Sequence, residues 1–431
     1  MQSLYSLFFT LYSNKMNKLP YILKNIFKKR FLIISYIVLI AFAVVFVVQQ
    51  QLRFDNIASN NVNEPYVDRS MYHIDVHVKY PDGRREWLYS GLRLCHLMTE
   101  MKTPENVSFS TWVRWEEFFQ DGKIVEIPYR ATDGRYWQMM RFDFTEGRPY
   151  TQEEVDDNKP LVVLSETSRK RFFGDERQVV GRQVEIQKRN LTVCGVVKDV
   201  PYSSPYAFGE YWMPYTAWME SNHNILGLFI VQVLAEKRSD FDAIHKEYLQ
   251  LIDQLNKEIA SEMEIGWTAF GTRAFNHYGK NRTSENYQLS AGDVWRNYLS
   301  TLWILLVPLL ALICLNFARV NDRSTEIGIR RMVGAGKTEI NSELIMESTI
   351  IIFIGILLGT FLGYLSVYLF PVAFIGIDTR DFNGGVSLSF TLNMFLHLFL
   401  TLVVFLAAST ALPMVRSGRQ SILKLLKGDE L

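Results

Sequence analysis

The sequence predicts an α-helical membrane protein with four transmembrane helices and a large extracytoplasmic mixed α/β domain made of two small lobes. Four apolar stretches approach the roughly 20 residues that a helix needs to cross a bilayer, and none contains Asp, Glu, Lys or Arg. They are residues 31–48, 298–318, 348–370 and 391–412. Basic residues gather beside their ends, and the long middle of the chain carries strand-like and helix-like patterns.

The basic residues predict the topology. They precede the first stretch, separate the second from the third and follow the fourth, whereas the link between the third and fourth has only Arg380. Cytoplasmic loops carry the excess of Lys and Arg, so we expect both termini in the cytoplasm. The expected segments are a cytoplasmic N-terminal segment (1–30), transmembrane helix 1 (31–50), the extracytoplasmic domain (51–296), transmembrane helix 2 (297–318), a charged cytoplasmic segment (319–343), transmembrane helix 3 (344–370), a short extracytoplasmic loop (371–390), transmembrane helix 4 (391–412) and a cytoplasmic tail (413–431).

The N-terminal segment predicts an interfacial helix followed by a retained anchor. Ile22, Leu23, Ile26 and Phe27 share one helical face, with lysines on another. Residues 1–14 lack charge, and we expect translation to start at Met16 rather than Met1. The first apolar stretch is too long for a typical signal peptide, and the glutamines that follow it offer no cleavage site.

The extracytoplasmic domain is expected to alternate strands and helices, which suggests two small α/β lobes. Expected strands lie at residues 72–79, 161–164, 179–186, 191–200 and 228–234. Expected helices lie at residues 166–173, closed by Gly174, and at 242–260. Six aromatic residues could bind apolar ligands but are interpreted as core: Trp112, Trp115, Tyr136, Trp137, Tyr211 and Trp212.

The sequence gives only weak indications of a metal site or a disulfide in this domain. His73, Asp75 and His77 would line one face of the first strand, which is compatible with a metal site. Without a fourth ligand, the polar face of a half-exposed strand is the favoured interpretation. Cys95 and Cys194 could pair in an oxidising compartment, but buried free thiols are favoured, and Cys314 lies in the second apolar stretch.

Several classes of function are disfavoured by composition. The net charge of +1 gives no reason to expect a nucleic-acid partner. The predicted spans offer only His397, Asn316, Asn393 and some hydroxyl groups, so a path for polar solutes through them is not expected. No Ser/His/Asp or paired-carboxylate signature indicates a catalytic domain outside the membrane.

The third apolar stretch carries a pattern for close helix packing. Gly355, Gly359 and Gly363 are four residues apart and share one helical face, where another helix can approach closely. The partner could be one of the chain's own spans or a second copy, and the chain's own spans are favoured.

The charged segment between the second and third stretches is amphipathic and does not bind nucleotide. Thr325, Ile329, Met332 and Val333 fall on one helical face, with charged residues on another. Its Gly-Lys-Thr at residues 336–338 resembles the end of a phosphate-binding loop, but Arg331 stands where that loop needs a glycine. Any ATP chemistry must therefore come from a partner.

The same segment carries a family resemblance. Residues 322–335 (DRSTEIGIRRMVGA) closely resemble the hallmark of FtsX-like, MacB-type ABC transporter permeases, at the expected place between a second and a third span. Residues 136–212 resemble the periplasmic core domain of that family, with FDFTEGRP, VVLSE and CGVVKDV. The resemblance runs from about residue 16 to residue 428.

The resemblance implies a dimeric permease in the bacterial inner membrane, driven by a separate ABC ATPase. ATP and Mg would be bound by that ATPase, with no cofactor in this chain. Other implied partners are a second copy or a paralogous permease, membrane lipid and a periplasmic adaptor. The residues that would couple to the ATPase are Arg323, Glu326, Ile327, Gly328, Arg330, Arg331, Gly334 and Ala335.

Two functions remain open within this resemblance. The first is a transporter in which ATP-driven motion moves the extracytoplasmic domains to export or release an antimicrobial, a peptide or a lipid-linked cargo. The second is an FtsX-like signal transmitter that controls an extracytoplasmic partner such as a cell-wall hydrolase. The large outside domain and its MacB-like motifs favour transport.

Overall fold

The structure is a computed structural model that describes residues 30–58, 60–120, 123–201, 204–219, 224–278, 336–370 and 392–419, with a few isolated residues between 287 and 329. The described residues belong to two compact units. One unit is helical and falls within Met1–Leu52, Tyr298–Phe374 and Leu388–Leu431. The other is α/β and falls within Arg53–Asn297 and Ile375–Ser387.

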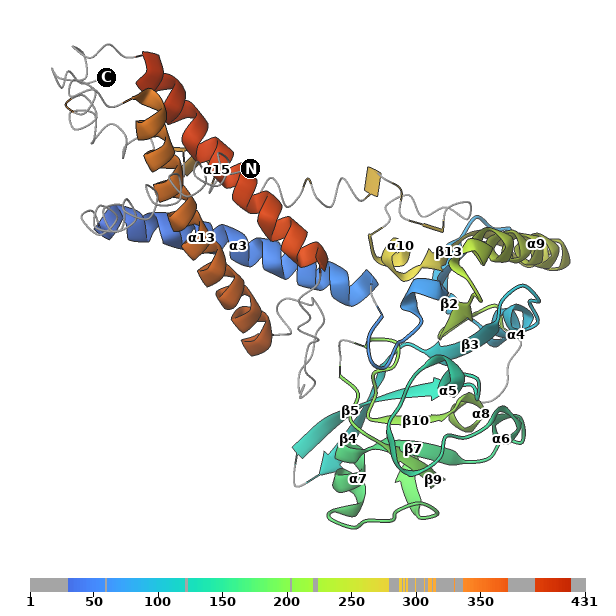
Figure 1. Cartoon of the computed structure of the whole chain (residues 1–431). Helices are drawn as coiled ribbons and strands as arrows, with labels where there is room; N and C mark the ends of the chain where they lie inside the picture. The colour runs from blue at the N-terminus through green and yellow to red at the C-terminus, as the bar shows by residue number, and fades with distance from the viewer. Residues whose placement is uncertain are drawn as a thin grey trace, which may run out of the picture. The chain divides into compact units, whose positions relative to one another are not determined.

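Three long helices make up the described part of the helical unit: α3 (Arg30–Ala58), α13 (Lys337–Leu369) and α15 (Leu392–Arg419) (Figure 1). Two of them are long and apolar enough to cross a membrane, over Ile33–Phe54 and Thr338–Leu369. The third has a shorter apolar stretch, Met394–Ala407. The predicted interfacial helix, the extracytoplasmic loop and nearly all of the second predicted span lie outside the described residues.

One mixed sheet runs through the α/β unit. Its first half, in spatial order, is β11 (Leu226–Gly227), β2 (Arg85–Ser90), β1 (Ser70–Lys79), β12 (Phe229–Leu234) and β3 (Asn106–Thr111), with β13 (Glu264–Thr272) also paired to β1. Its second half is β5 (Lys123–Thr132), β10 (Tyr211–Pro214), β7 (Leu161–Ser165), β9 (Arg189–Val197) and β6 (Phe144–Gly147), with β4 (Arg114–Gln120) on β5 and β8 (Gln183–Ile186) on β9.

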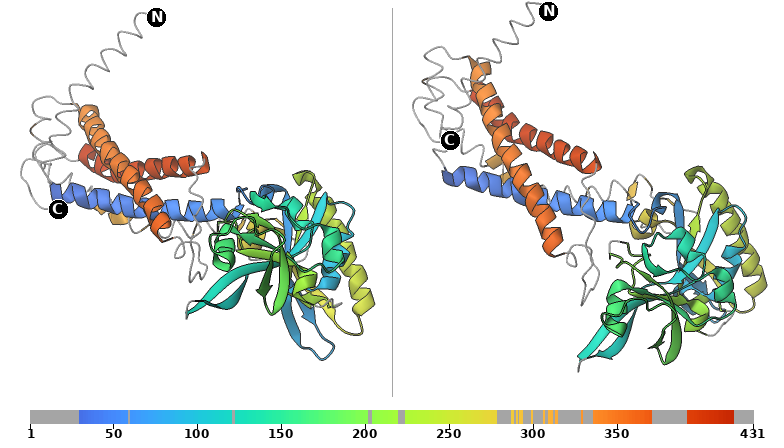
Figure 2. Two further views of the ribbon diagram at one scale, coloured as in Figure 1. Left: turned by 90° about the horizontal axis from the view of Figure 1, so that it is seen from below. Right: turned by 60° about the horizontal axis from the view of Figure 1, so that its bottom comes forward.

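Helices cover both halves of this sheet (Figures 1 and 2). The helices of the first half are α4 (Leu92–Thr99), α9 (Phe241–Ile259) and α10 (Arg273–Tyr278). Those of the second half are α5 (Tyr136–Met139), α6 (Gln152–Asp156), α7 (Glu166–Phe173) and α8 (Tyr215–Trp218), and two short 3₁₀ turns lie at Val67–Arg69 and Arg238–Asp240. The α9 face that packs inward carries Phe241, Ile244, Tyr248, Ile252 and Leu255, at the spacing of an amphipathic helix.

The second half of the sheet is an insertion between β3 and β12. These two strands pair along their length, from Asn106↔Leu234 to Phe229↔Thr111, although the second half separates them in sequence. The halves join where Ser110 of β3 pairs with Thr132 of β5. The two lobes expected from the sequence are therefore halves of one continuous sheet, because β3 pairs on both of its sides.

The strands of the second half divide their side chains between two cores, as the two-residue period of a strand requires. On β7, Val163 joins the large core that continues through the first half. Its neighbours Val162 and Leu164 join a second core on the opposite face. Of the aromatic residues interpreted as core, Trp212 faces the first core and Tyr211 the second, whereas Trp115 joins neither of these two cores.

His73 departs from its predicted environment. The expectation was a half-exposed polar face, yet His73 is fully buried, and the pairing of β1 is irregular between His73 and Val76. Its ring nitrogens lie 2.7 Å from Ser90 Oγ and 2.8 Å from Tyr248 Oη, and burial lowers its pKa to about 3. Within the described residues no group of three His, Cys, Asp or Glu side chains could hold a metal ion.

The two domain cysteines are free thiols. Cys95 is fully buried on α4, where burial raises its pKa well above the usual value. Cys194 lies on β9, and burial raises its pKa to about 12. Both thiols are held in the protonated form, so neither is a reactive nucleophile.

Candidate functional site

The predicted ATPase-coupling residues lie outside the described part of the chain. This holds for Arg323, Glu326, Ile327, Gly328, Arg330, Arg331, Gly334 and Ala335. Their role remains a prediction.

The predicted glycine face of α13 lies directly against α3. A Cβ atom added to any of the three glycines would lie within 3 Å of α3, a separation that real Cβ atoms essentially never show. The nearest atoms would be Ile40 Cγ2 at 2.7 Å for Gly355, Ala41 O at 2.6 Å for Gly359 and Val48 Cβ at 2.9 Å for Gly363. The glycines therefore allow two helices of one chain to approach closely.

A polar contact continues this helix pair. Gln49 Nε2 of α3 donates a hydrogen bond of 3.0 Å to Ser366 Oγ of α13. Ser366 Oγ in turn donates to the carbonyl of Gly363, 2.7 Å away, within its own helix. An interhelical hydrogen bond of this kind adds to the packing of small residues in a membrane.

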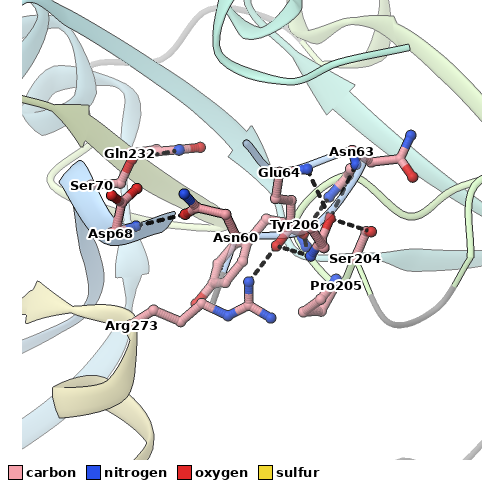
Figure 3. A network of polar contacts seen from close by, with 12 residues as sticks. Asn60, Asn63, Glu64, Asp68, Ser70, Ser204, Pro205, Tyr206, Gln232 and Arg273 are labelled. Carbon is pink, nitrogen blue, oxygen red and sulfur yellow. Dashed lines mark hydrogen bonds and ion pairs between the residues drawn. The ribbon is translucent and has the colours of Figure 1, made fainter. Parts of the chain in front are cut away.

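A second site lies in the α/β unit, where the chain leaves α3. We call it the junction cluster, and it consists of Asn61, Glu64, Ser204, Tyr206 and Arg273. Figure 3 shows Glu64, Ser204, Tyr206 and Arg273. Asn61 and Glu64 follow the end of α3, and Arg273 begins α10, the last described helix before the second predicted span. The cluster therefore joins the segment at which the chain enters the domain to a helix near the C-terminal end of the domain in sequence.

A buried ion pair forms the centre of the junction cluster. Arg273 Nη1 donates to Glu64 Oε2, and the exposed fractions of the two side chains are only 4% and 1%. Burial by itself lowers the pKa of Arg273, but the Glu64 carboxylate and the nearby Tyr72 and Tyr206 raise it overall. Arg273 is thus held in its charged form, and loss of its partner would leave a lone buried charge, which is strongly unfavourable.

The other carboxylate oxygen of Glu64 holds a loop of the inserted half. Its Oε1 accepts hydrogen bonds from the backbone N–H groups of Tyr206, at 2.7 Å, and Ala207, at 3.1 Å. Asn61 Oδ1 accepts one from Ser204 Oγ at 2.8 Å and also one from the N–H of Glu64, at 2.8 Å. Charge-assisted bonds of this kind are stronger than neutral ones, so the loop is firmly tied to the segment after α3.

Aromatic rings complete the cluster. The Arg273 guanidinium lies over the Tyr206 ring, 5.2 Å from its centroid, and Tyr206 stacks on Tyr72 of β1 with centroids 4.4 Å apart. Burial raises the pKa of Tyr206 to about 12. A cation over an aromatic face contributes roughly 2 kcal/mol when it is desolvated, which adds to the ion pair.

Arg130 also holds this loop. This fully buried arginine of β5 donates to the carbonyl oxygens of Phe208 at 2.8 Å, Thr111 at 2.6 Å and Pro205. It thereby ties β3, β5 and the loop together at the place where the halves of the sheet join. The segment after α3 is consequently linked to both halves.

The cluster has the chemistry of a structural contact. Its charges are paired and buried, its carboxylate is saturated with donors, and its groups are not arranged as a nucleophile and base. Sequence reasoning missed it because Glu64 and Arg273 are 209 positions apart. The only local signal was the Asn-rich turn at residues 60–63, immediately after an apolar helix.

Comparisons with known proteins identify the chain's family. Two family models match, the MacB-like periplasmic core domain over residues 33–250 and the FtsX-like permease C-terminal over residues 298–422. The macrolide export ATP-binding/permease protein MacB of Salmonella typhi is 21% identical over 285 residues, which cover 64% of this chain and 39% of that protein. The probable syringafactin export ATP-binding/permease protein SyfD of Pseudomonas syringae pv. tomato is 22% identical over 261 residues, covering 58% of this chain and 35% of SyfD.

A solved structure is also similar. The periplasmic region of MacB from Actinobacillus actinomycetemcomitans has 17% sequence identity and a TM-score of 0.34, over 46% of this chain and 87% of that one. The chain spans less than two fifths of the length of the two curated relatives. Because the first family model matches just over half of the chain and the second includes the charged motif, this protein belongs to the MacB-like family of ABC transporter permeases, inner-membrane transporters with a periplasmic domain.

Proposed function

We propose that the chain is the permease subunit of an ABC transporter, in which ATP hydrolysis by a separate ATPase moves the periplasmic domain. The movement would serve export or release of an antimicrobial, a peptide or a lipid-linked cargo. Relatives named for macrolide and syringafactin export support the direction of transport. The scarcity of charged residues in the predicted spans supports a cargo that is handled outside the membrane.

The junction cluster is the observation that carries this proposal. Helix α3 is a single helix of 29 residues, and Glu64 follows its end after a short turn. Glu64 is bonded to Arg273 and to the loop around Tyr206. A displacement of the end of α3 would therefore be passed to the folded domain. Buried and packed elements move as rigid bodies, so this junction suits the transmission of motion.

The mechanism also implies the other subunits of the transporter and their contacts with this chain. The segment at residues 319–335 would contact the ATPase, which would bind ATP and Mg. Both termini would be cytoplasmic, and a second permease copy or paralogue would complete the transporter. A periplasmic adaptor would fit an export system of this type.

Charge reversal in the predicted coupling segment tests the proposal. Arg330→Glu together with Arg331→Glu should abolish ATPase co-purification and substrate-stimulated ATP turnover, because an acidic pair replaces the cations expected at the contact. Membrane insertion, measured by fractionation, should be unchanged. Arg416→Glu with Arg419→Glu, in the basic cluster after the fourth span, is the matched control and should retain co-purification. Normal assembly and turnover in the Arg330/Arg331 variant would refute the coupling role.

A further inference from the structure

The two halves of the sheet meet over a short length of β3 and β5. On one side of β3, the strand pairs with β12 along its whole length, whereas on the other side only Ser110 pairs with Thr132 of β5. A backbone bond also crosses nearby, from the N–H of Asp133 to the carbonyl of Phe109 at 3.2 Å. Regions held by few bonds open more readily than the strands around them, so side chains decide how firmly this β3–β5 contact is closed.

The carboxyl group of Asp133 bonds to both halves at once. Its Oδ1 atom accepts hydrogen bonds from Ser108 Oγ of β3 at 2.6 Å and from the N–H of Tyr136, the first residue of α5, at 3.0 Å. Arg130 closes one end of the contact through Thr111, and Asp133 closes the other. Asp133 is only 1% exposed, so a change in the charge of its carboxyl group acts directly on the contact between the halves.

The surroundings of Asp133 favour its neutral form. Both hydrogen bonds to the carboxyl group come from neutral donors. The largest influence on its pKa is burial, which raises it to about 7, and Arg135 at the start of α5 lowers it by less. A carboxylate that is buried among neutral groups is unfavourable and is drawn toward water.

Other titratable groups face Asp133 from the elements around it. They are the Cys95 thiol of α4, the phenol group of Tyr150 before α6 and that of Tyr215 on α8. Burial raises the pKa of each of these three groups, so they stay neutral near pH 7. The exposed His96 of α4 has its ring 6.2 Å from that of Tyr215, between centroids, and β3 carries no titratable side chain.

We propose that Asp133 is a proton-dependent link between the two halves of the periplasmic domain. With its proton bound, the carboxyl group stays buried and holds β3 to α5. When the proton leaves for the solvent, the carboxylate is drawn to water and the β3–β5 contact opens more often. The inserted half is therefore held less firmly as the pH outside the inner membrane rises. This inference rests on the α/β domain alone and is independent of the ATPase coupling proposed above.

Hydrogen exchange of the full chain in detergent, followed by mass spectrometry between about pH 5 and pH 8, tests this link. Each exchange rate is divided by that of an unstructured amide at the same pH. Protection of the Asp133 and Tyr136 amides should fall about tenfold per pH unit up to roughly pH 6.5 and level off above pH 7, because opening releases one proton in that interval. These amides should exchange faster than those of β7 and β9. About 1 M urea should leave their rates unchanged, because a local opening exposes little surface.

Four variants identify the group responsible. Asp133→Asn should make protection at the β3–β5 contact independent of pH, since an amide does not ionise. Ser108→Ala removes a hydrogen bond that lowers the pKa of Asp133, so the levelling off should move to higher pH. Asp143→Asn, at a residue that is 62% exposed in the same half, and His96→Gln are the matched controls and should respond to pH as the parent does.

Three results would overturn the proposal. The first is exchange of the Asp133 and Tyr136 amides at the rates of β7 and β9 at every pH, which indicates unfolding of the whole domain. The second is protection that does not change with pH, and the third is a pH response that survives Asp133→Asn. If Asp133→Asn does not fold, an unchanged levelling off in Ser108→Ala has the same meaning.

Discussion

At the scale of single residues, Glu64 is the side chain that connects the other parts of the junction cluster. One carboxylate balances a buried guanidinium and accepts two backbone N–H groups from another part of the domain. Its removal would leave Arg273 buried without a counter-charge. A buried ion pair of this kind adds little net stability, because desolvation offsets its attraction, but removal of one partner is costly.

The first residue-scale prediction concerns this pair. Glu64→Gln should destabilise the protein by about 3–5 kcal/mol, since one buried charge loses its partner. The midpoint of thermal unfolding of the full chain in detergent, followed by tryptophan fluorescence, should fall by roughly 6–20 °C. The double variant Glu64→Gln with Arg273→Met should recover most of this loss. Equal midpoints for the single and double variants would show that the two side chains are not coupled.

A second residue-scale prediction concerns pH. Asp133, after β5, is buried and accepts hydrogen bonds from Ser108 Oγ at 2.6 Å and from the N–H of Tyr136 at 3.0 Å. Burial raises its pKa to about 7 from 3.8, so between these values the folded state keeps a proton that the unfolded state releases. The contribution of Asp133 to stability is therefore present at low pH and is lost as the pH rises to about 7.

Asp133→Asn should remove this pH dependence while keeping the hydrogen-bond acceptor. From pH 4 to pH 7 the variant should gain about 2–4 kcal/mol of unfolding free energy relative to the parent. His73, whose pKa falls to about 3, acts in the opposite direction, so the variant must be compared with the parent at each pH. Parallel pH profiles of the unfolding midpoint would contradict the assignment.

The burial and contacts of individual side chains were the hardest features to predict from the sequence. His73 was expected on a half-exposed face, but the tertiary contact with Tyr248 of α9 places it in the core. The Glu64–Arg273 pair could not be predicted, because neither residue has a local signature and their proximity depends on the whole sheet. Burial of a charge is decided by elements distant in sequence, and no local pattern encodes it.

At the scale of elements, the sequence predicted helix boundaries well where local capping residues set the ends of the helix. Helix α7 occupies the predicted residues, because Ser165 caps its first turn by accepting from the N–H of Ser168 at 3.1 Å and Gly174 closes it with φ of 62°. Helix α9 was likewise predicted within one residue at each end. Strand β8 begins at Gln183 rather than at residue 179, since Gln178 and Gly181 have φ of 65° and 86° and form a turn.

The element-scale prediction concerns the glycine face of α13. Gly359→Leu should separate α13 from α3, because even a Cβ atom would lie 2.6 Å from the carbonyl oxygen of Ala41. With cysteines at Gln49 and Ser366 in a chain without its natural cysteines, a short thiol cross-linker should join these positions within one chain. The Gly359 variant should lower that yield several-fold.

Phe361→Leu is the matched control for this helix pair. Phe361 is 64% exposed on the same helix, so its replacement should leave the yield unchanged. Cross-linked dimers in place of internal cross-links would instead assign the glycine face to a second copy.

At the scale of the whole molecule, the sequence predicted the division into apolar helices and an α/β domain. That division depends on the composition of long segments, so a wrong interpretation of a few residues does not change it. The connection between the two lobes was not predictable, because the Ser110↔Thr132 pairing that makes one sheet of them is a single register contact. Likewise, the α3–α13 pairing could be expected from glycine spacing but not distinguished from pairing between copies.

The long separation between Glu64 and Arg273 has a consequence for biogenesis. At about 5–20 residues per second, synthesis takes roughly 10–40 s to advance the 209 positions from Glu64 to Arg273. During that time α3 is already made, while the carboxylate after it has no cation to bind. The Glu64–Arg273 pair can form only after β13 and α10 have reached the same compartment. The junction cluster is therefore completed late in synthesis. A chain truncated before Arg273 cannot form the Glu64–Arg273 ion pair.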